Sequence, residues 1–181
     1  MNPYGPQQLA NAIRTVRKNT ILVAEDIPEE SYGYRVTPDS RSVTETLLHI
    51  AAAPQISLSI HGSERVSSIE DFQLFGKILK DAPIHEKLPY SKEQIVDLLR
   101  IEGEKWAEFV ERMPQEQADE LVTMPNGGAQ SRFEMLQGMK EHEMHHRAQL
   151  MVVERLLGVV PHLTRNRRPA PPVATAAAAA H

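Results

Sequence analysis

The residues with the clearest chemical potential form a cluster of histidines between Glu141 and Gln149. Three of the chain's eight histidines fall within five residues there, namely His142, His145 and His146. In a helix, His142 and His146 lie one turn apart, so their imidazole rings leave the same face and can bind one metal ion. Neutral imidazole is a good ligand for zinc, nickel, copper or iron. The spacing therefore indicates a metal site on a helix, completed by a ligand from elsewhere.

The apolar residues around this cluster predict that it faces the core of a helix bundle. Steps of four and three residues connect Met135, Met139, His142, His146, Gln149, Val153 and Leu156. Buried imidazoles need partners, and His49 also lies among apolar residues, in an earlier predicted helix. We therefore expect His49, His142 and His146 to bind one metal ion, with further positions open for water or substrate, as in catalytic metal sites.

Other polar residues could assist this site. Glu102 lies on the apolar stripe of the third predicted helix, where it could act as a general base or support a ligand histidine, or simply reach solvent. Tyr32 and Tyr34, in a loop after the first helix, are candidate pocket groups. His145 lies about 60° around the helix from His142, which places it at the flank of the stripe. It could support the site or remain on the surface.

An alternative interpretation reads residues 142–146 as the HExxH motif of zinc peptidases. Glu143 would then be the general base. The extended form of that motif has a third histidine six residues later, where this chain has Val152, and the third ligands that could replace it, Glu154 and His162, have no recognised spacing. Zinc-peptidase folds also contain a sheet, and no segment here alternates as a strand would. The bundle interpretation is therefore favoured.

Composition limits the classes of protein that remain. At 181 residues, with 41% hydrophobic and 24% charged residues, the chain suits one globular domain. Its net charge of −4 argues against a nucleic-acid partner. The absence of cysteine restricts a tight metal site to nitrogen and oxygen ligands. No apolar run is long enough to span a membrane, and the N-terminus does not resemble a signal peptide, so we expect a cytoplasmic location.

Helix signals predict an all-α fold, a four-helix bundle. Capping boxes begin the later three helices at Ser42, Ser91 and Ser131, and Pro54 should kink the second helix or end it early. The four helices are expected at residues 6–25, 42–60, 91–113 and 131–157.

Two further segments complete the predicted organisation. Residues 61–90 are too long for a tight turn, so this crossover between helices two and three should carry a short helix and make those two helices parallel. The bundle is expected over residues 1–163. Residues 164–181 form a proline- and alanine-rich tail, which would need a contact such as a second subunit to become ordered.

Two stretches resemble signatures of the DinB-like family, over roughly residues 6–163. They are Ser42-Val43-Thr44-Glu45-Thr46-Leu47-Leu48-His49-Ile50-Ala51 and His142-Glu143-Met144-His145-His146-Arg147-Ala148-Gln149-Leu150. The resemblance implies a four-helix bundle, a divalent metal held by His49, His142 and His146, and frequent homodimers. Family members are described as metal-dependent hydrolases, and some relatives transfer low-molecular-weight thiols such as bacillithiol, mycothiol or glutathione. This chain has Ala148 at a position where glycine is common in the DinB-like family.

Two functional classes follow from these observations. The first is a metal-dependent enzyme, a thiol transferase or hydrolase in which a zinc- or nickel-bound thiolate or water attacks a small-molecule electrophile. The second is a non-catalytic, stress-associated bundle in which the metal is a structural clip. A clip should be closed by four protein ligands, whereas an enzyme should show three ligands and a cleft. The three good candidate ligands favour the enzyme.

Overall fold

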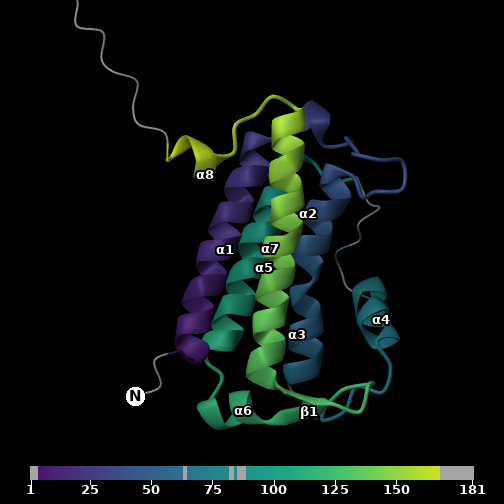
Figure 1. Cartoon of the computed structure of the whole chain (residues 1–181), viewed down its shortest axis with the longest axis vertical. Helices are drawn as coiled ribbons and strands as arrows, with labels where there is room; N and C mark the ends of the chain where they lie inside the picture. The colour runs from purple at the N-terminus through teal and green to yellow at the C-terminus, as the bar shows by residue number, and fades with distance from the viewer. Residues whose placement is uncertain (1–3, 63–64, 82–83, 85–88, 168–181) are drawn as a thin grey trace, which may run out of the picture.

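Four helical segments lie side by side in the computed structural model, which describes residues 4–62, 65–81, 84 and 89–167 (Figure 1). The first, third and fourth segments are single helices, and the second is a pair of helices in succession. The segments are α1 (Pro6–Asp26), α2 with α3 (Val43–Ala52 and Pro54–His61), α5 (Lys92–Glu111) and α7 (Arg132–Leu156). The predicted all-α, four-helix bundle is confirmed.

Local sequence signals explain where these helices begin and end. Ser42, Ser91 and Ser131 each accept a hydrogen bond from the backbone three residues on, and the side chain at that position bonds back to the serine's own backbone. Such caps satisfy N–H groups that have no partner within the helix, each worth about 1 kcal/mol. At the other end of α7, Gly158 has φ of +78°, a left-handed conformation that glycine adopts readily and that ends the helix.

The expected kink in the second helix occurs at Pro54. Helix α2 ends at Ala52 and α3 begins at Pro54, while Ala53 keeps helical dihedral angles and donates to the His49 carbonyl at 2.9 Å. Proline lacks the N–H that would continue this ladder, and its ring displaces the preceding turn. The break therefore bends the helix just below His49.

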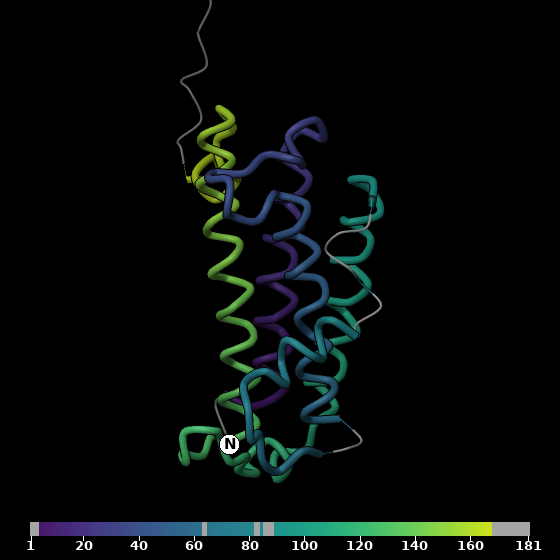
Figure 2. The backbone as a smooth tube through the Cα atoms, turned by 90° about the vertical axis from the view of Figure 1, so that its right-hand side faces the viewer, coloured from purple at the N-terminus to yellow at the C-terminus, as the bar shows by residue number. Residues whose placement is uncertain are grey.

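The bundle is up, down, down, up, because a long crossover joins its second and third segments. The Lys92 ammonium, at the start of α5, donates to the Ile27 carbonyl at 2.7 Å, just beyond the end of α1. At the opposite end Gln7 bonds Glu111. Helix α5 is thus antiparallel to α1 and parallel to α2 and α3, as predicted. The crossover carries the expected short helix, α4 (Gln73–Asp81), on the outside of the bundle (Figure 2).

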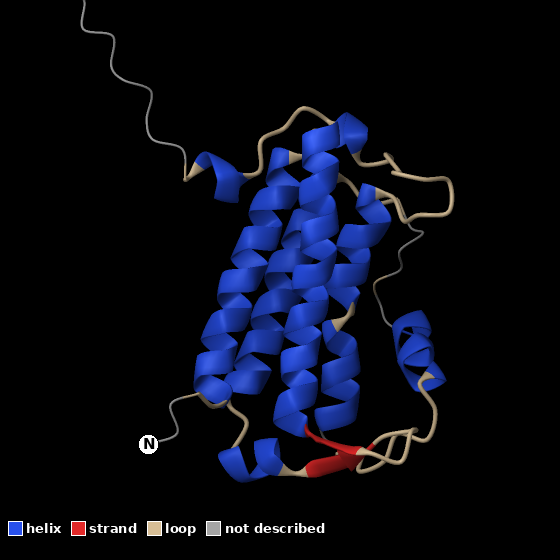
Figure 3. Ribbon diagram, in the orientation of Figure 1, coloured by secondary structure: helices blue, strands red, loops and turns tan. Residues whose placement is uncertain are grey.

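A small hairpin at the lower end of the bundle was not predicted. Strands β1 (Leu121–Thr123) and β2 (Ala129–Ser131) pair in antiparallel register around a turn in which Gly127 has φ of +79° (Figure 3). The expectation of no strands was wrong because three-residue strands are too short to show alternation. The short helix α6 (Gln115–Asp119) precedes the hairpin.

The C-terminal part of the described chain folds back on the bundle. Helix α8 (His162–Arg165) crosses the domain boundary expected at residue 163, and Arg165 bonds the Asp26 carboxylate at 2.7 Å. Most of the predicted tail, residues 168–181, lies outside the described residues. Within the part of the chain that the structure describes, no helix is long and apolar enough to cross a membrane.

The buried hydrophobic residues form three clusters, and one of them fixes the two helices that carry the histidines. In this cluster, Leu47, Leu48 and Ile50 of α2 pack with Leu150 and Val153 of α7, and all five are at least 93% buried. Close packing of this kind transmits small shifts and tolerates few voids. Helices α2 and α7 therefore have a fixed mutual register where His49 faces His142 and His146.

Candidate metal centre

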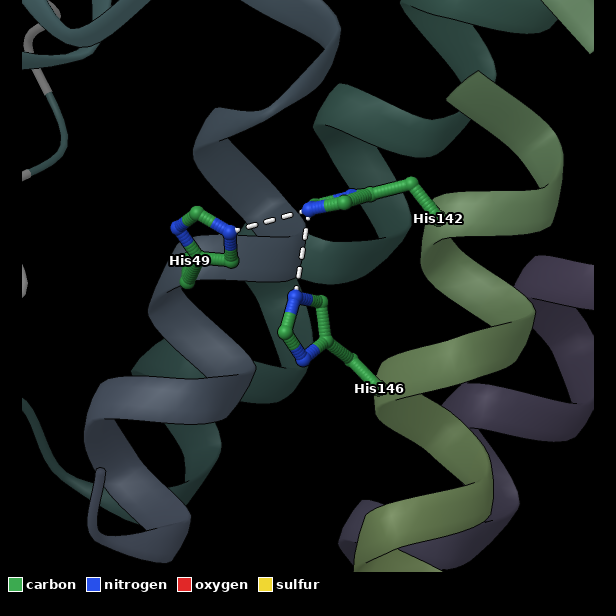
Figure 4. A group of neighbouring side chains, drawn as sticks. All are labelled: His49, His142 and His146. Carbon is green, nitrogen blue, oxygen red and sulfur yellow. Dashed lines mark hydrogen bonds between the residues drawn. The ribbon is translucent and has the colours of Figure 1, made fainter. Parts of the chain in front are cut away.

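Three imidazole rings converge between α2 and α7 in the middle of the bundle (Figure 4). The His142 Nε2 atom lies 3.1 Å from the Nε2 atom of His49 and 3.1 Å from that of His146. One nitrogen from each ring falls within 4.8 Å of the others. His49 is 7% exposed, His146 is 9% exposed and His142 is half-buried. The structure thus brings together the three residues expected to bind metal.

The surroundings of His142 and His146 favour their neutral forms. Burial, and then the neighbouring His146 and His49, lower the pKa of His142 to about 4. Burial also lowers the pKa of His146, against a raising effect of its hydrogen bond to Gln149. A neutral imidazole has one nitrogen lone pair available as a ligand. His142 and His146 are therefore competent as ligands at neutral pH.

Gln149 sets the orientation of His146. Its Oε1 atom lies 2.9 Å from the His146 Nδ1 atom, so Nδ1 carries the proton and donates, which leaves the Nε2 lone pair facing His142. The Gln149 amide nitrogen lies 3.1 Å from the Nε2 atom of His145. His145 therefore contacts the group that orients His146, and it does not join the three converging nitrogens.

The geometry fits a divalent metal ion. Zinc–imidazole bonds are about 2.0–2.1 Å, which places tetrahedral nitrogen ligands about 3.3 Å apart. Two of the nitrogen separations are 3.1 Å. The His142 Nε2 atom has either one proton or one lone pair, so it cannot form linear hydrogen bonds with both His49 and His146. In addition, the buried His142 Nδ1 atom has no hydrogen-bond partner among the described residues. This donor set is therefore suited to zinc or nickel, and at least one coordination position stays available.

The two carboxylates considered as catalytic groups bond elsewhere. Glu143 receives hydrogen bonds from Arg17 Nε at 2.9 Å, Arg17 Nη2 at 3.0 Å and Thr20 Oγ1 at 2.7 Å, all on the α1 side of α7. Glu102 is 7% exposed and bonds Gln55 and Lys105 at 3.0 and 2.6 Å. Neither belongs to the group of converging ligand atoms. Glu143 therefore does not lie beside the three histidines, as the general base of an HExxH motif would. Glu102 is buried, so it does not reach solvent as a glutamate at the end of the bundle would.

The inward face of α7 differs from the predicted stripe. Leu156 is 57% exposed and Gln149 is also exposed. The buried residues Leu136, Glu143 and Leu150 each follow a residue of the predicted stripe by one position, which is about 100° around the helix. The buried face is therefore centred to one side of the predicted stripe, and Leu156, on the other side, lies at the surface. The buried positions are Arg132, Leu136, Glu143, His146, Leu150, Val153 and Glu154.

Of the two tyrosines expected as pocket groups, Tyr32 and Tyr34, only one lines a cavity beside the site. Tyr32 is 6% exposed and its hydroxyl donates to the Ala24 carbonyl at 2.8 Å, so it is a core residue and the expectation of a pocket group was wrong. Tyr34 does line a cavity beside His146. Sequence reasoning missed Arg17, although its position four residues after Ile13 and three before Thr20 places it on the apolar stripe of α1.

Two cavities border the converging histidines on different sides. The loop-side cavity, about 720 Å³, lies between residues 34–43 and α7, and it is lined by His146, Gln149, Tyr34 and Arg41. The α4-side cavity, about 650 Å³, lies between α3, α4 and α7 and is lined by His49 and His142. Both volumes are typical of small-molecule sites.

Comparisons with known proteins agree with this fold. The chain is 24% identical over 156 residues to YjoA of Bacillus subtilis, an uncharacterised protein, covering 83% of this chain and 90% of that one. The crystal structure of the DinB-like protein YjoA has a TM-score of 0.62 at 21% identity, covering 83% of this chain and 92% of that one. A DinB-like protein from Bacillus cereus has a TM-score of 0.64 at 18% identity, covering 85% and 93%.

A third solved structure has the same fold at lower identity. YfiT from Bacillus subtilis, described as a probable metal-dependent hydrolase with an unusual four-helix bundle topology, has a TM-score of 0.64 at 13% identity, covering 88% of this chain and 93% of that one. The sequence model of the DinB family matches residues 1–171. With its up, down, down, up bundle and its facing histidines on α2 and α7, the chain belongs to the DinB family.

Proposed function

We propose that this protein is a divalent-metal-dependent enzyme of the transferase or hydrolase type, acting on a small molecule. His49, His142 and His146 are the proposed ligands. The observation that carries the proposal is the convergence of their three nitrogens within 4.8 Å, at a place bordered by two cavities of small-molecule size. YfiT, which has the same fold, is described as a probable metal-dependent hydrolase.

The number of ligands favours an enzyme over a structural clip. Among the described residues, no fourth histidine, aspartate or glutamate joins the three nitrogens. Structural zinc sites are usually closed by four protein ligands, and catalytic sites keep a position open. A bound zinc or nickel ion would supply a Lewis acid that lowers the pKa of a water or thiol in the open position.

The surrounding residues orient one of the proposed ligands and favour a negatively charged reactant. Gln149 holds His146 in the tautomer that turns Nε2 toward the centre. Arg41 lines the loop-side cavity, and after burial and the neighbouring histidines its positive charge also lowers the pKa values of His142 and His146. A positive guanidinium favours an anionic reactant there. We therefore propose a low-molecular-weight thiol with carboxylate groups as the reactant of the loop-side cavity.

We extend the proposal to a homodimer. Val152 and Leu156 are 53% and 57% exposed and lie four residues apart on α7, so they form an apolar strip along its outer face. Exposed apolar surface of this kind is common at subunit contacts. Light scattering of the wild type and of Leu156→Lys tests this contact: the proposal expects a dimer mass that falls to the monomer mass in the variant.

Metal content tests the proposed ligands. Protein purified without a nickel column is analysed by mass spectrometry, in the wild type and in His49→Ala. His145→Ala is the matched control, because it removes a neighbouring histidine that does not converge with the other three. We expect about one metal ion per chain in the wild type and the control, and none in His49→Ala. Equal metal content in all three proteins would contradict the proposed three-histidine site.

Turnover is tested with the zinc-loaded protein. Cysteine and 1-chloro-2,4-dinitrobenzene report thiol transfer, in which a sulfur–carbon bond forms, chloride leaves and the thiol proton passes to solvent. A p-nitrophenyl ester reports hydrolysis. We expect one of these activities to depend on bound zinc and to be lost in His49→Ala. Stoichiometric zinc without either activity would support the alternative of a non-catalytic metal-binding bundle.

A further inference from the structure

The α4-side cavity differs in chemistry from the loop-side cavity. Its walls are apolar along most of their length, and the side chains that carry the argument are Ile56, Ile60, Phe75, Met124, Met135 and Met139. Three of the chain's seven methionines are among them. Methionine is flexible and polarizable, so a surface rich in it adapts to apolar molecules of different shape. One end of this apolar cavity is formed by His49 and His142.

Charge also separates the two cavities. Glu134 and Glu141 line the α4-side cavity, and neither lysine nor arginine lines it in the part of the chain that is described. The loop-side cavity contains Arg41 together with Asp39. An anion is therefore repelled by the carboxylates of the α4-side cavity and finds a positive group only on the other side.

Helix α4 forms an incompletely buried wall of this cavity. Its apolar residues Leu74, Phe75, Ile78 and Leu79 face the bundle, yet none of the residues of α4 is buried. The cavity also contains Ser57, whose buried Oγ atom has no hydrogen-bond partner among the described residues. An apolar molecule with one polar atom would cover the exposed faces of Phe75 and Leu79 and offer that hydroxyl a partner.

We propose that the α4-side cavity binds the second reactant, an uncharged molecule with an aliphatic or aromatic body, while the anionic reactant enters from the loop side. The two reactants then meet at the histidines, because His146 lines the loop-side cavity, His49 and His142 line the α4-side cavity, and the His142 Nε2 atom lies 3.1 Å from the Nε2 atoms of the other two rings. This inference deepens the proposed function and rests on it for the reaction itself. Binding in the cavity can be measured separately.

A matched pair of fluorescent probes tests the charge preference. N-phenyl-1-naphthylamine is uncharged, and 8-anilinonaphthalene-1-sulfonate has the same ring skeleton with one negative charge. With the zinc-loaded full chain we expect the uncharged probe to bind at least tenfold more tightly. Glu141→Lys, an exposed substitution at the cavity wall, should reduce that preference severalfold. A wild type that binds both probes equally, or neither, would overturn the proposal.

Two tryptophan variants locate the bound probe. Met139→Trp fills the α4-side cavity, and Val36→Trp, at a residue that is 53% exposed, fills the loop-side cavity as the matched control. We expect Met139→Trp to weaken the uncharged probe at least tenfold and Val36→Trp to leave it unchanged. The reverse result would place the apolar reactant on the loop side and contradict the proposal.

Metal analysis of the same samples separates the two proposals. If the wild type contains zinc but does not bind the uncharged probe, the cavity assignment fails and the proposed metal enzyme stands. If the probe binds as expected but no metal can be loaded, the assignment of the cavity as an apolar site stands and the proposed function fails. Circular dichroism of Met139→Trp and Glu141→Lys confirms that each variant is folded before its affinity is compared.

Discussion

Arg17 and Glu143 form a buried ion pair, with Nε–Oε1 at 2.9 Å and Nη2–Oε2 at 3.0 Å and both side chains 4% exposed. The same guanidinium donates to the carbonyl of Leu99 on α5 at 2.7 Å and of Ile50 on α2 at 3.3 Å. Arg17 therefore connects all four segments of the bundle. Because Ile50 follows His49 and Glu143 follows His142, Arg17 also contacts both ligand-bearing helices, through the backbone of α2 and a side chain of α7.

Glu143→Gln tests whether this carboxylate is structural. Loss of its charge leaves the Arg17 guanidinium buried without a counter-ion, and removing one member of a buried pair costs about 3 kcal/mol or more. We expect the urea-unfolding free energy to fall by that amount, while the folded variant still binds about one zinc ion. Glu141→Gln, an exposed substitution on the same helix, should change neither quantity. A Glu143→Gln protein that is stable but inactive would instead indicate a general base.

Gly103→Ala tests how closely α5 must approach Arg17. A Cβ atom at Gly103 would lie 2.6 Å from the Arg17 Cγ and 3.0 Å from its Nη1 atom. The guanidinium cannot move aside without losing Glu143, so we expect a loss of about 1–3 kcal/mol in unfolding free energy. Gly138→Ala is the matched control within a helix, since its added Cβ meets nothing within 4 Å. That control should be stabilised by about 0.5–1 kcal/mol, as measured by thermal or urea unfolding.

The elements of the bundle were predictable because their signals are local. Each capping box lies within four residues, and the break at Pro54 follows from the missing N–H of one residue. The spacing of His142 and His146 likewise follows from one turn of helix. Their pairing with His49 was expected from the burial pattern and the DinB-like resemblance, and the structure places the three rings together.

The remaining features depend on contacts between distant residues. Arg17 and Glu143 are 126 residues apart, and no pattern within either helix indicates which charged residue the other will meet. The α4-side cavity is formed by α3, α4, α7 and the residues beside the hairpin, so its apolar character appears only when these elements are assembled. The position of Glu102 on the apolar stripe of α5 cannot distinguish a bond to Lys105 from one to a histidine.

Gln149→Leu tests the orientation of His146. Leucine has a similar size but cannot accept the His146 Nδ1–H bond, so the imidazole loses the partner that fixes its tautomer. Removing such a partner typically costs about 10–100-fold in metal affinity. We expect that loss for zinc in competition with a chromophoric chelator.

Gln149→Glu is the control for this substitution. Its carboxylate retains the acceptor, and zinc affinity should therefore stay within a few-fold of the wild type. An unchanged affinity in Gln149→Leu would mean that neighbouring packing alone orients His146.

Glu154→Gln tests an unpaired buried carboxylate near the end of α7. Glu154 is fully buried, and neither of its oxygens has a hydrogen-bond donor among the described residues. Burial, and then the negative charge of Asp26, raise its pKa from 4.5 to about 7, against the opposing effects of Arg165 and Arg155. In the folded protein it keeps its proton up to about pH 7, whereas in the unfolded chain it loses the proton near pH 4.5.

The pH dependence of stability follows from this difference. Between pH 4.5 and 7 the folded state binds more protons than the unfolded state, so the unfolding free energy of the wild type falls as pH rises. The accumulated loss at pH 8 is on the order of 2–3 kcal/mol. The amide of Glu154→Gln does not titrate, and the variant should therefore be more stable than the wild type at pH 8 and similar to it at pH 4.5. Urea unfolding at both pH values, with Glu141→Gln as the exposed control, measures this difference; parallel pH profiles for all three proteins would show that Glu154 gains a partner in solution.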